Sequence, residues 1–190
     1  TNYGQHARPP SLAEYVDALR REVPALFEPE LQLVTELGRA LQTGCGFAVS
    51  RVEYVKEVDG RRLATVHVGA DLLVRTAYVP SDWPHELLVL DAEGRAREGE
   101  PQLWTVLGPL CFASDVLARD RPLPAIAEGD LVVVRDTGGY TLGMWSRHCS
   151  RGIPEVVGLR GESAHPRLRT LRPRETAPDV VRFWGEGTPT

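Results

Sequence analysis

Short apolar runs separated by turn signals dominate the sequence from Phe47 onward, and this pattern limits the fold more than any other feature. Apolar residues recur through 49–55 and through 63–68, and the turn 58–60 (Val-Asp-Gly) lies between the two runs. An Asp-Gly step between apolar runs is a strong hairpin signal, and 91–94 (Asp-Ala-Glu-Gly) marks a later turn. Short strands with such turns are typical of a β-barrel or a β-sandwich. Further strands are expected near 103–107, 130–135, 154–159 and 167–171, and helical turns near 115–118 and 176–183.

The residues before this region follow a different pattern. Ser11 and Glu14 have the spacing of a capping box, and apolar residues at helical spacing follow, so an amphipathic helix is expected over 11–27. Residues 31–35 (Leu-Gln-Leu-Val-Thr) form a short apolar run typical of a buried strand, and a turn is expected at 36–39. The coarse prediction is a βα unit followed by a mostly β domain, with the boundary near residue 45.

Charge and composition exclude several classes of function. The chain has 190 residues and a formal net charge of -4, which gives no case for a nucleic-acid or anionic-membrane partner. No apolar run approaches the roughly 20 residues that span a bilayer, and the first residues lack a secretory signal, so a cytoplasmic protein is expected. Cys45, Cys111 and Cys149 form no CxxC pair, and the histidines show no metal-ligand spacing. Neither a disulfide framework nor a metal site is predicted.

Four short segments occur in a recognisable order. They are 36–39 (Glu-Leu-Gly-Arg), 69–75 (Gly-Ala-Asp-Leu-Leu-Val-Arg), 108–115 (Gly-Pro-Leu-Cys-Phe-Ala-Ser-Asp) and 138–140 (Gly-Gly-Tyr). In this order they resemble the ornithine/diaminopimelate decarboxylase family of fold type III. The resemblance implies a pyridoxal 5'-phosphate cofactor, a phosphate-binding barrel followed by a β domain, and active sites at a homodimer interface.

The same resemblance assigns the parts of the chain. Residues 1–44 would be the last helix and strand of a truncated TIM-type α/β barrel, whose N-terminal half is a missing partner. Residues 45–190 would be the C-terminal β domain, in which some late strands or the last helix pack back on the barrel.

Two of the segments supply candidate cofactor-binding residues. The resemblance implies that the Glu36 carboxylate faces the pyridine nitrogen of the cofactor and keeps it protonated, and that Arg39 reaches the phosphate or the substrate side. Gly38 would permit close approach of the backbone, although Leu37 replaces the family proline. Tyr140 is similar to the family tyrosine that contacts the cofactor phosphate. The bland alternatives are a helix-start glutamate with a surface arginine, and a tyrosine that only packs.

Cys111 is the candidate catalytic residue. The resemblance implies that it enters the site of the neighbouring subunit and donates a proton after CO2 is lost, which suits a thiol whose pKa can be tuned. A cysteine beside Leu110 and Phe112 is otherwise typical of a small buried apolar residue.

Four residues are candidates for substrate binding. Arg75 matches an arginine that holds a substrate carboxylate in diaminopimelate decarboxylases, and Tyr78 is a displaced counterpart of the tyrosine that follows it. The family usually has Asp or Glu after the cysteine to pair with the distal amine of a diamino substrate, but this chain has Phe112. Asp115 is the alternative partner for such an amine. Because burying an unpaired ammonium is unfavourable, an apolar, carboxylate-bearing or carrier-tethered amino acid fits Phe112 at least as well.

The chain lacks a suitable Schiff-base lysine. Lys56 is its only lysine, and it lies in a run that leads into a hairpin, where a solvated side chain is expected. The family's Schiff-base lysine lies upstream of all the segments present here. The resemblance therefore implies that the intact protein is a homodimeric decarboxylase and that this chain alone is inactive. A fragment, one chain of a split enzyme, and a non-catalytic dimerisation or regulatory module derived from such an enzyme all stay open. A fold-type III racemase is not expected to carry the Cys111 and Glu36 segments in this arrangement.

Overall fold

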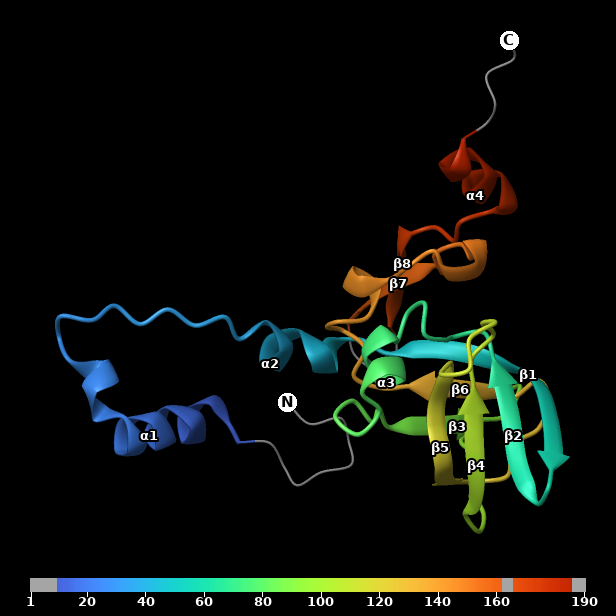
Figure 1. Cartoon of the computed structure of the whole chain (residues 1–190), viewed down its shortest axis with the longest axis horizontal. Coiled ribbons are helices and arrows are strands. Elements are labelled where there is room, and N and C mark those ends of the chain that lie inside the picture. The colour runs from blue at the N-terminus through green and yellow to red at the C-terminus, as the bar shows by residue number, and fades with distance from the viewer. Residues whose placement is uncertain (1–9, 162–165, 186–190) are drawn as a thin grey trace. The chain divides into compact units, whose positions relative to one another are not determined.

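The computed structural model describes residues 10–161 and 166–185 and divides into two units, the first ending at Met144 and the second beginning at Trp145. Figure 1 shows the elements in chain order. The helices and strands of the first unit are α1 (Leu12–Glu22), α2 (Gly38–Gln42), β1 (Ala48–Val58), β2 (Arg61–Val66), α3 (Val74–Tyr78), β3 (Leu87–Leu90), β4 (Gln102–Leu107), β5 (Val116–Leu123) and β6 (Leu131–Val134). The second unit has β7 (Val156–Arg160), β8 (Arg167–Arg172) and α4 (Ala177–Trp184). Short 3-10 turns occupy Pro24–Phe27, Thr43–Cys45, Leu142–Met144 and His148–Ser150.

Helix α1 begins where the sequence predicts and ends earlier. The Ser11 hydroxyl accepts a hydrogen bond from the Glu14 backbone N–H at 3.2 Å, and the Glu14 carboxylate accepts one from the Ser11 N–H at 2.7 Å. This capping box fixes the first turn. The helix stops at Glu22 rather than at residue 27, because Pro24 disfavours helical geometry at Val23, whose φ and ψ are -138° and 64°. A 3-10 turn then follows.

The strand expected at 31–35 is not formed. Residues 31–37 have no regular secondary structure, and Leu31, Leu33 and Val34 are exposed by 54%, 47% and 81%. A strand needs a neighbour to pair with, and none of the described strands pairs with this segment. The prediction of a buried strand is therefore wrong for the chain as it stands, and the proposed boundary near residue 45 stays a prediction.

Six strands of the first unit form one curled sheet in the order β3-β6-β1-β2-β4-β5. All neighbours are antiparallel except β2 and β4, which run parallel with Leu63 opposite Thr105. The two edge strands, β3 and β5, come into contact, and Arg121 of β5 donates to the carbonyl of His85 just before β3 at 3.0 Å. The predicted mostly β fold is confirmed. Of the two expected architectures, barrel and sandwich, the curled sheet is closer to the barrel and forms a half-barrel.

Curvature comes from irregular pairing in the long strands. Strand β1 pairs with β6 through its first residues and with β2 through its later ones, with a bulge near Val52 and Tyr54. Bulges bend a strand and increase its twist. The concave side holds the apolar core, in which Val52, Ala64, Val106 and Val132 are almost completely buried. At the β1–β2 turn, Asp59 and Gly60 have φ values of 51° and 72°, as the Asp-Gly signal predicts.

Two parts of the sheet differ from the sequence prediction. The helical turn expected at 115–118 is wrong, because Val116–Leu123 forms β5 and pairs with β4. Helix α3 and strand β3 were not expected. The strands predicted near 103–107 and 130–135 are confirmed to within one residue at each end.

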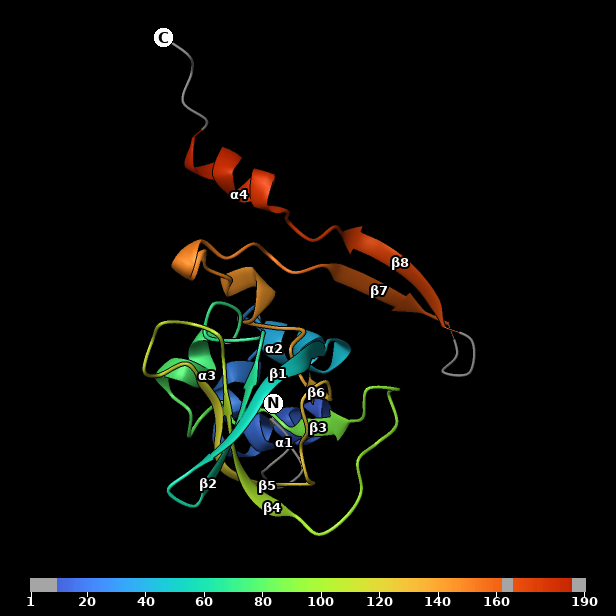
Figure 2. The same ribbon diagram turned by 90° about the vertical axis from the view of Figure 1, so that its right-hand side faces the viewer.

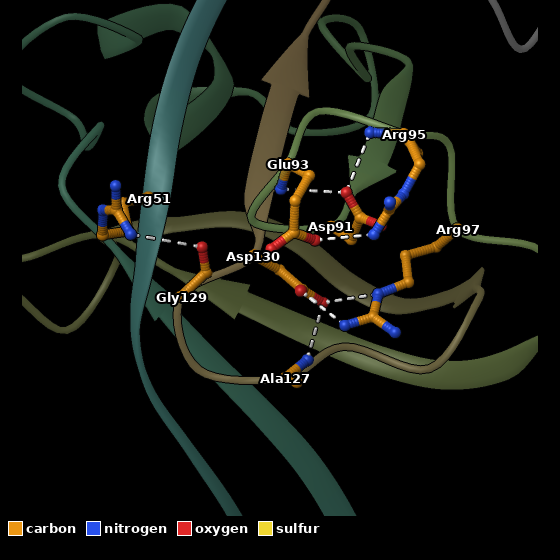
Figure 3. Close-up of polar contacts among 8 residues, drawn as sticks. All are labelled: Arg51, Asp91, Glu93, Arg95, Arg97, Ala127, Gly129 and Asp130. Atoms are coloured by element: carbon orange, nitrogen blue, oxygen red, sulfur yellow. Dashed lines mark hydrogen bonds and ion pairs between the residues drawn. The ribbon is translucent and has the colours of Figure 1, made fainter.

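Asp130, just before β6, has a buried carboxylate that holds together the loop after β3 and the loop before β6. Asp130 is 1% exposed and accepts from the guanidinium of Arg97 at 2.7 and 3.1 Å and from the Ala127 N–H at 2.9 Å (Figure 3). Its own carbonyl accepts from the Val52 N–H at 2.7 Å. The neighbouring turn is held separately by Asp91 (Figure 3).

The second unit has a small polar centre of its own. Strands β7 and β8 pair antiparallel, and α4 follows them (Figure 2). The strands expected near 154–159 and 167–171 and the helical turn expected near 176–183 are confirmed to within two residues at each end. The Arg147 guanidinium donates to both carboxylate oxygens of Glu175 at 2.9 and 3.0 Å, and its Cζ lies 4.2 Å from the ring centroid of Phe183. Glu175 also accepts from the Ile153 N–H at 2.9 Å. This ion pair links the segment just before α4 to the loop before β7.

Candidate functional site

Three residues that the sequence predicts as binding residues meet around one tryptophan. The guanidinium carbon (Cζ) of Arg39, from α2, lies 4.7 Å from the Trp83 ring centroid, and that of Arg75, from α3, lies 4.4 Å from it. Arg75 Cζ also lies 4.4 Å from the ring centroid of Tyr140. The rings of Trp83 and Tyr140 are 6.1 Å apart with an interplanar angle of 61°. We call Arg39, Arg75, Trp83 and Tyr140 the arginine–aromatic cluster.

The loop that carries Tyr140 is fixed to the end of α2. The Gly138 N–H donates to the Thr43 carbonyl at 3.0 Å, and the Thr137 N–H donates to the Gly46 carbonyl at 2.9 Å. A Cβ on Gly138 would overlap the Gln42 carbonyl oxygen, so only glycine permits this approach. Tyr140 itself has a φ of 58°, a left-handed conformation that costs a non-glycine residue about 1 kcal/mol or more. The surrounding contacts therefore hold Tyr140 in an unfavourable backbone conformation.

Trp83 is the member of the cluster that sequence reasoning missed. No motif of the sequence surrounds it. It is 9% exposed, and its carbonyl accepts from the Thr76 hydroxyl and from the His85 N–H, both at 3.1 Å. The first of these bonds ties the loop before β3 to α3, which carries Arg75. Only the tertiary structure identifies Trp83, since the loop and the helix meet through these contacts.

The cluster concentrates positive charge. The two guanidinium carbons are at most about 9 Å apart, the sum of their 4.7 and 4.4 Å distances to the Trp83 centroid. Two like charges at that separation repel by about 0.5 kcal/mol in water and by more at lower dielectric. Cation–π contacts of about 0.5–2 kcal/mol each offset this repulsion. Within the described ranges no carboxylate pairs with Arg75, so its N–H groups are available to an anion from outside the chain.

Asp115 joins two of the predicted segments. It is 4% exposed, and its carboxylate accepts from the backbone N–H groups of Ala70 and Leu110, each at 2.6 Å. A Cβ on Gly69 would lie 2.7 Å from this carboxylate, and one on Gly108 would overlap it. The geometry favours Asp115 as a clip between the segment before α3 and the turn that carries Cys111, rather than as the partner of a substrate amine.

The remaining predicted residues lie at the surface. Cys111 is exposed on a turn in which the Asp115 N–H donates to the Phe112 carbonyl at 2.9 Å, and Phe112 is 37% exposed. Tyr78 is 74% exposed at the end of α3, and Glu36 is exposed before α2. A Cβ on Gly38 would meet nothing within 4 Å, so no close approach within this chain requires a glycine there. The roles of these five residues stay predictions.

A cavity of about 450 Å³ lies beside α3, the helix that carries Arg75. Its wall includes Thr76 and Ala77 of α3, Ser114 of the Cys111 turn, and Arg119 and Arg121 of β5. The cavity therefore opens between the two segments that carry the predicted substrate and proton-donor residues.

Other features bear on the remaining sequence predictions. Lys56 is exposed on β1, opposite Leu63. Across residues 10–161 and 166–185, no three His, Cys, Asp or Glu side chains come together as a metal site would require. In the same part of the chain no helix has the length and apolarity needed to cross a bilayer.

The comparisons with known proteins agree on one family. The family model described as "Pyridoxal-dependent decarboxylase, C-terminal sheet domain" matches residues 33–138, more than half of the chain. A diaminopimelate decarboxylase of Pseudomonas aeruginosa is 34% identical over 174 residues, which are 91% of this chain and 38% of the relative. The enzyme of the same name from Haemophilus influenzae is 30% identical over 90% of this chain and 39% of the relative. The chain therefore spans less than half the length of the curated relatives it matches.

Solved structures give the same result. A crystal structure of diaminopimelate decarboxylase covers 97% of this chain with a TM-score of 0.78 and 27% identity, and the match spans 45% of that chain. The diaminopimelate decarboxylase of Helicobacter pylori, complexed with L-lysine, covers 98% with a TM-score of 0.77 and 25% identity, and the match spans 42% of that chain.

Proposed function

The chain belongs to the pyridoxal-dependent decarboxylases, whose C-terminal sheet domain it contains, and we propose that the whole protein removes a carboxyl group from an amino acid as CO2. One observation carries the proposal, which is the convergence of Arg39, Arg75 and Tyr140 on Trp83. Because the relatives are more than twice as long as the matched region, the proposal concerns this chain together with a barrel portion that supplies the lysine.

The cluster fits an anionic cofactor. Its polar groups are two guanidiniums and a phenol, all of which donate hydrogen bonds, and such a set suits phosphate or carboxylate. Pyridoxal phosphate, when bound, supplies an acceptor for the electrons released with CO2. We assign Tyr140 and Arg39 to its phosphate side and Glu36 to its ring nitrogen.

Arg75 is assigned to a substrate carboxylate. Its guanidinium lies against the rings of Trp83 and Tyr140. These contacts use the charge of the guanidinium and leave its N–H groups able to donate hydrogen bonds. A planar guanidinium that keeps free donors can form two parallel bonds to one carboxylate. Arg75 therefore orients the substrate, with Tyr78 at the end of the same helix as a further contact.

Cys111 is assigned to proton donation in the site of a second subunit, which makes the protein a homodimer. Its turn is exposed, so another chain can reach it, and Asp115 holds the turn in one conformation. The thiol would donate a proton to the carbon that has lost CO2 and take one back from solvent.

Phe112 bears on the choice of substrate. It stands where a carboxylate would pair with a distal ammonium, and it is partly exposed beside Cys111. An apolar residue at this position disfavours a charged amine, because the amine would lose water without gaining a partner. We propose a substrate whose far end carries no ammonium. Diaminopimelate, after which the relatives are named, is the substrate to compare it with.

The test is CO2 release by the full-length protein with pyridoxal phosphate, over diaminopimelate, ornithine, glutamate and leucine. We expect release from glutamate or leucine at a higher kcat/KM than from diaminopimelate or ornithine, and the reverse order would refute the proposed substrate class. Arg75→Leu should reduce kcat/KM by about 100-fold, the effect of losing a bond of about 3 kcal/mol. Arg61→Leu, on the exposed side of β2, is the matched control. Absence of release from every substrate would favour the non-catalytic module, and equal effects of the two variants would exclude Arg75 from the site.

Cys111 is tested separately. Cys111→Ser should lower formation of the correctly protonated amine by about 100-fold or more, within the range for a lost general acid. Cys149→Ser, at another exposed cysteine, should leave it unchanged. Unimpaired product formation by Cys111→Ser would exclude the proton-donor role.

A further inference from the structure

We infer that Trp83 is a positioning residue whose indole holds Arg75 and Arg39 together as one anion-binding unit. The inference rests on the proposed function and adds a residue that no sequence motif marks. Trp83 itself offers no charge to a ligand, so its effect is exerted through the two arginines.

The geometry singles out Trp83 as the shared member of the cluster. Arg39 comes from α2 and Arg75 from α3, and the ring of Trp83 contacts both guanidiniums, with Cζ-to-centroid distances of 4.7 and 4.4 Å. Tyr140 contacts Arg75 from a second direction. The electron-rich face of an indole attracts cations more strongly than the rings of tyrosine or phenylalanine do. Trp83 therefore stabilises a pair of like charges that would otherwise move apart.

The indole is held firmly enough to act in this way. Trp83 is 9% exposed, whereas Tyr140 is 42% exposed. Its backbone carbonyl is fixed by two donors, the Thr76 hydroxyl and the His85 N–H. Thr76 is adjacent to Arg75 in α3, so this bond holds the backbone of Trp83 beside the helical turn that carries Arg75. A long arginine side chain that is stacked in advance loses less freedom when it binds an anion.

The first measurement needs neither cofactor nor turnover. In this chain, the Hε signal of Arg75 in a proton–nitrogen NMR spectrum should be shifted upfield by the rings that flank it. Trp83→Leu should move that signal toward its free position, and Trp83→Phe should retain part of the shift. Titration with inorganic phosphate should move the Arg75 signal in the wild type at concentrations about tenfold lower than in Trp83→Leu, as expected from losing a cation–π contact.

Trp104→Phe is the matched control. Trp104 is 4% exposed in the core of the same unit, on β4, and no described contact joins it to either arginine. It should reduce stability toward urea without changing the Arg75 signal or the phosphate midpoint. An Arg75 signal that is the same in Trp83→Leu and the wild type, with both folded, would overturn the inference.

The second measurement uses the full-length protein. Trp83→Leu should raise KM for the substrate by about tenfold, and in an Arg75→Leu background the same substitution should raise it little further. Equal effects in the two backgrounds would show that Trp83 acts on folding alone and would refute the inference. If the wild type releases no CO2, the proposed function fails, while the NMR result still decides the role of Trp83.

Discussion

The clip formed by Asp115 gives a prediction that can be worked out from the structure. Asp115→Ala removes the acceptor of two backbone N–H groups, those of Ala70 and Leu110, each bonded at 2.6 Å to a side chain that is 4% exposed. A buried donor left without a partner costs about 1–3 kcal/mol, which gives about 2–6 kcal/mol for two. Because Ala70 and Leu110 are half-buried and water can partly replace the lost acceptor, the free energy of unfolding should fall by about 2–4 kcal/mol, in the lower part of this range. Asp115→Asn keeps one acceptor oxygen and should lose about half as much.

The glycine beneath the carboxylate makes the test specific. A Cβ at Gly108 would overlap the Asp115 carboxyl group, which cannot withdraw because both of its oxygens are bonded. Gly108→Ala should therefore destabilise the wild type by about 1–3 kcal/mol, as an overpacked site does. In Asp115→Ala the carboxyl group is gone, so adding Gly108→Ala should cost little more. The two substitutions should be coupled by about 1–3 kcal/mol.

Urea unfolding followed by tryptophan fluorescence, on the two single variants and the double variant, measures this coupling. Gly143→Ala is the control, because a Cβ there meets nothing within 4 Å, and it should leave stability nearly unchanged. Additivity of Asp115→Ala and Gly108→Ala within about 0.5 kcal/mol would refute the reasoning, since independent sites behave in that way.

Three further predictions concern charged groups. Burial lowers the pKa of His85 below its ordinary 6.5, so stability that is present above that pH should be lost as the pH falls below it. His85→Gln should reduce the dependence of the free energy of unfolding on pH, measured by urea unfolding at pH 5.5–7, by up to one proton. The Arg147 guanidinium holds the pKa of Glu175 below its ordinary 4.5, so the second unit should lose far-ultraviolet ellipticity as the pH falls below that value, and Glu175→Gln should show less of this acid-dependent change. Arg97→Met should lower the urea midpoint more than Asp130→Asn does, because it leaves a carboxylate that is 1% exposed without its cation.

Local signals in the sequence predicted local structure well. The turn at Asp59 and Gly60 and the capping box of Ser11 are set by residues within four positions of one another, and both form as predicted. The run 31–35 has the apolar character of a strand, yet it forms no strand and is exposed, because a strand also needs a neighbour, which the sequence of the run does not determine.

The candidate site shows the same limit. The motifs containing Arg39, Arg75 and Tyr140 predicted three of the residues that meet, since each lies in a short pattern of its own. Trp83 has no such pattern, and Asp115 looks like a ligand for an amine until its oxygens are seen bonded to the backbone. Both roles depend on contacts between distant segments.

The parallel pairing of β2 with β4 has a consequence for how the molecule folds. A hairpin can close its strands over two residues, but Leu63 and Thr105 meet only after the intervening chain has formed a loop. That loop holds Arg75, Trp83 and β3, and closing a long loop costs chain entropy before any contact offsets it. High contact order of this kind slows folding. Ligand-binding geometry should therefore mature late during refolding, after the hairpins have already acquired their protection against amide hydrogen exchange.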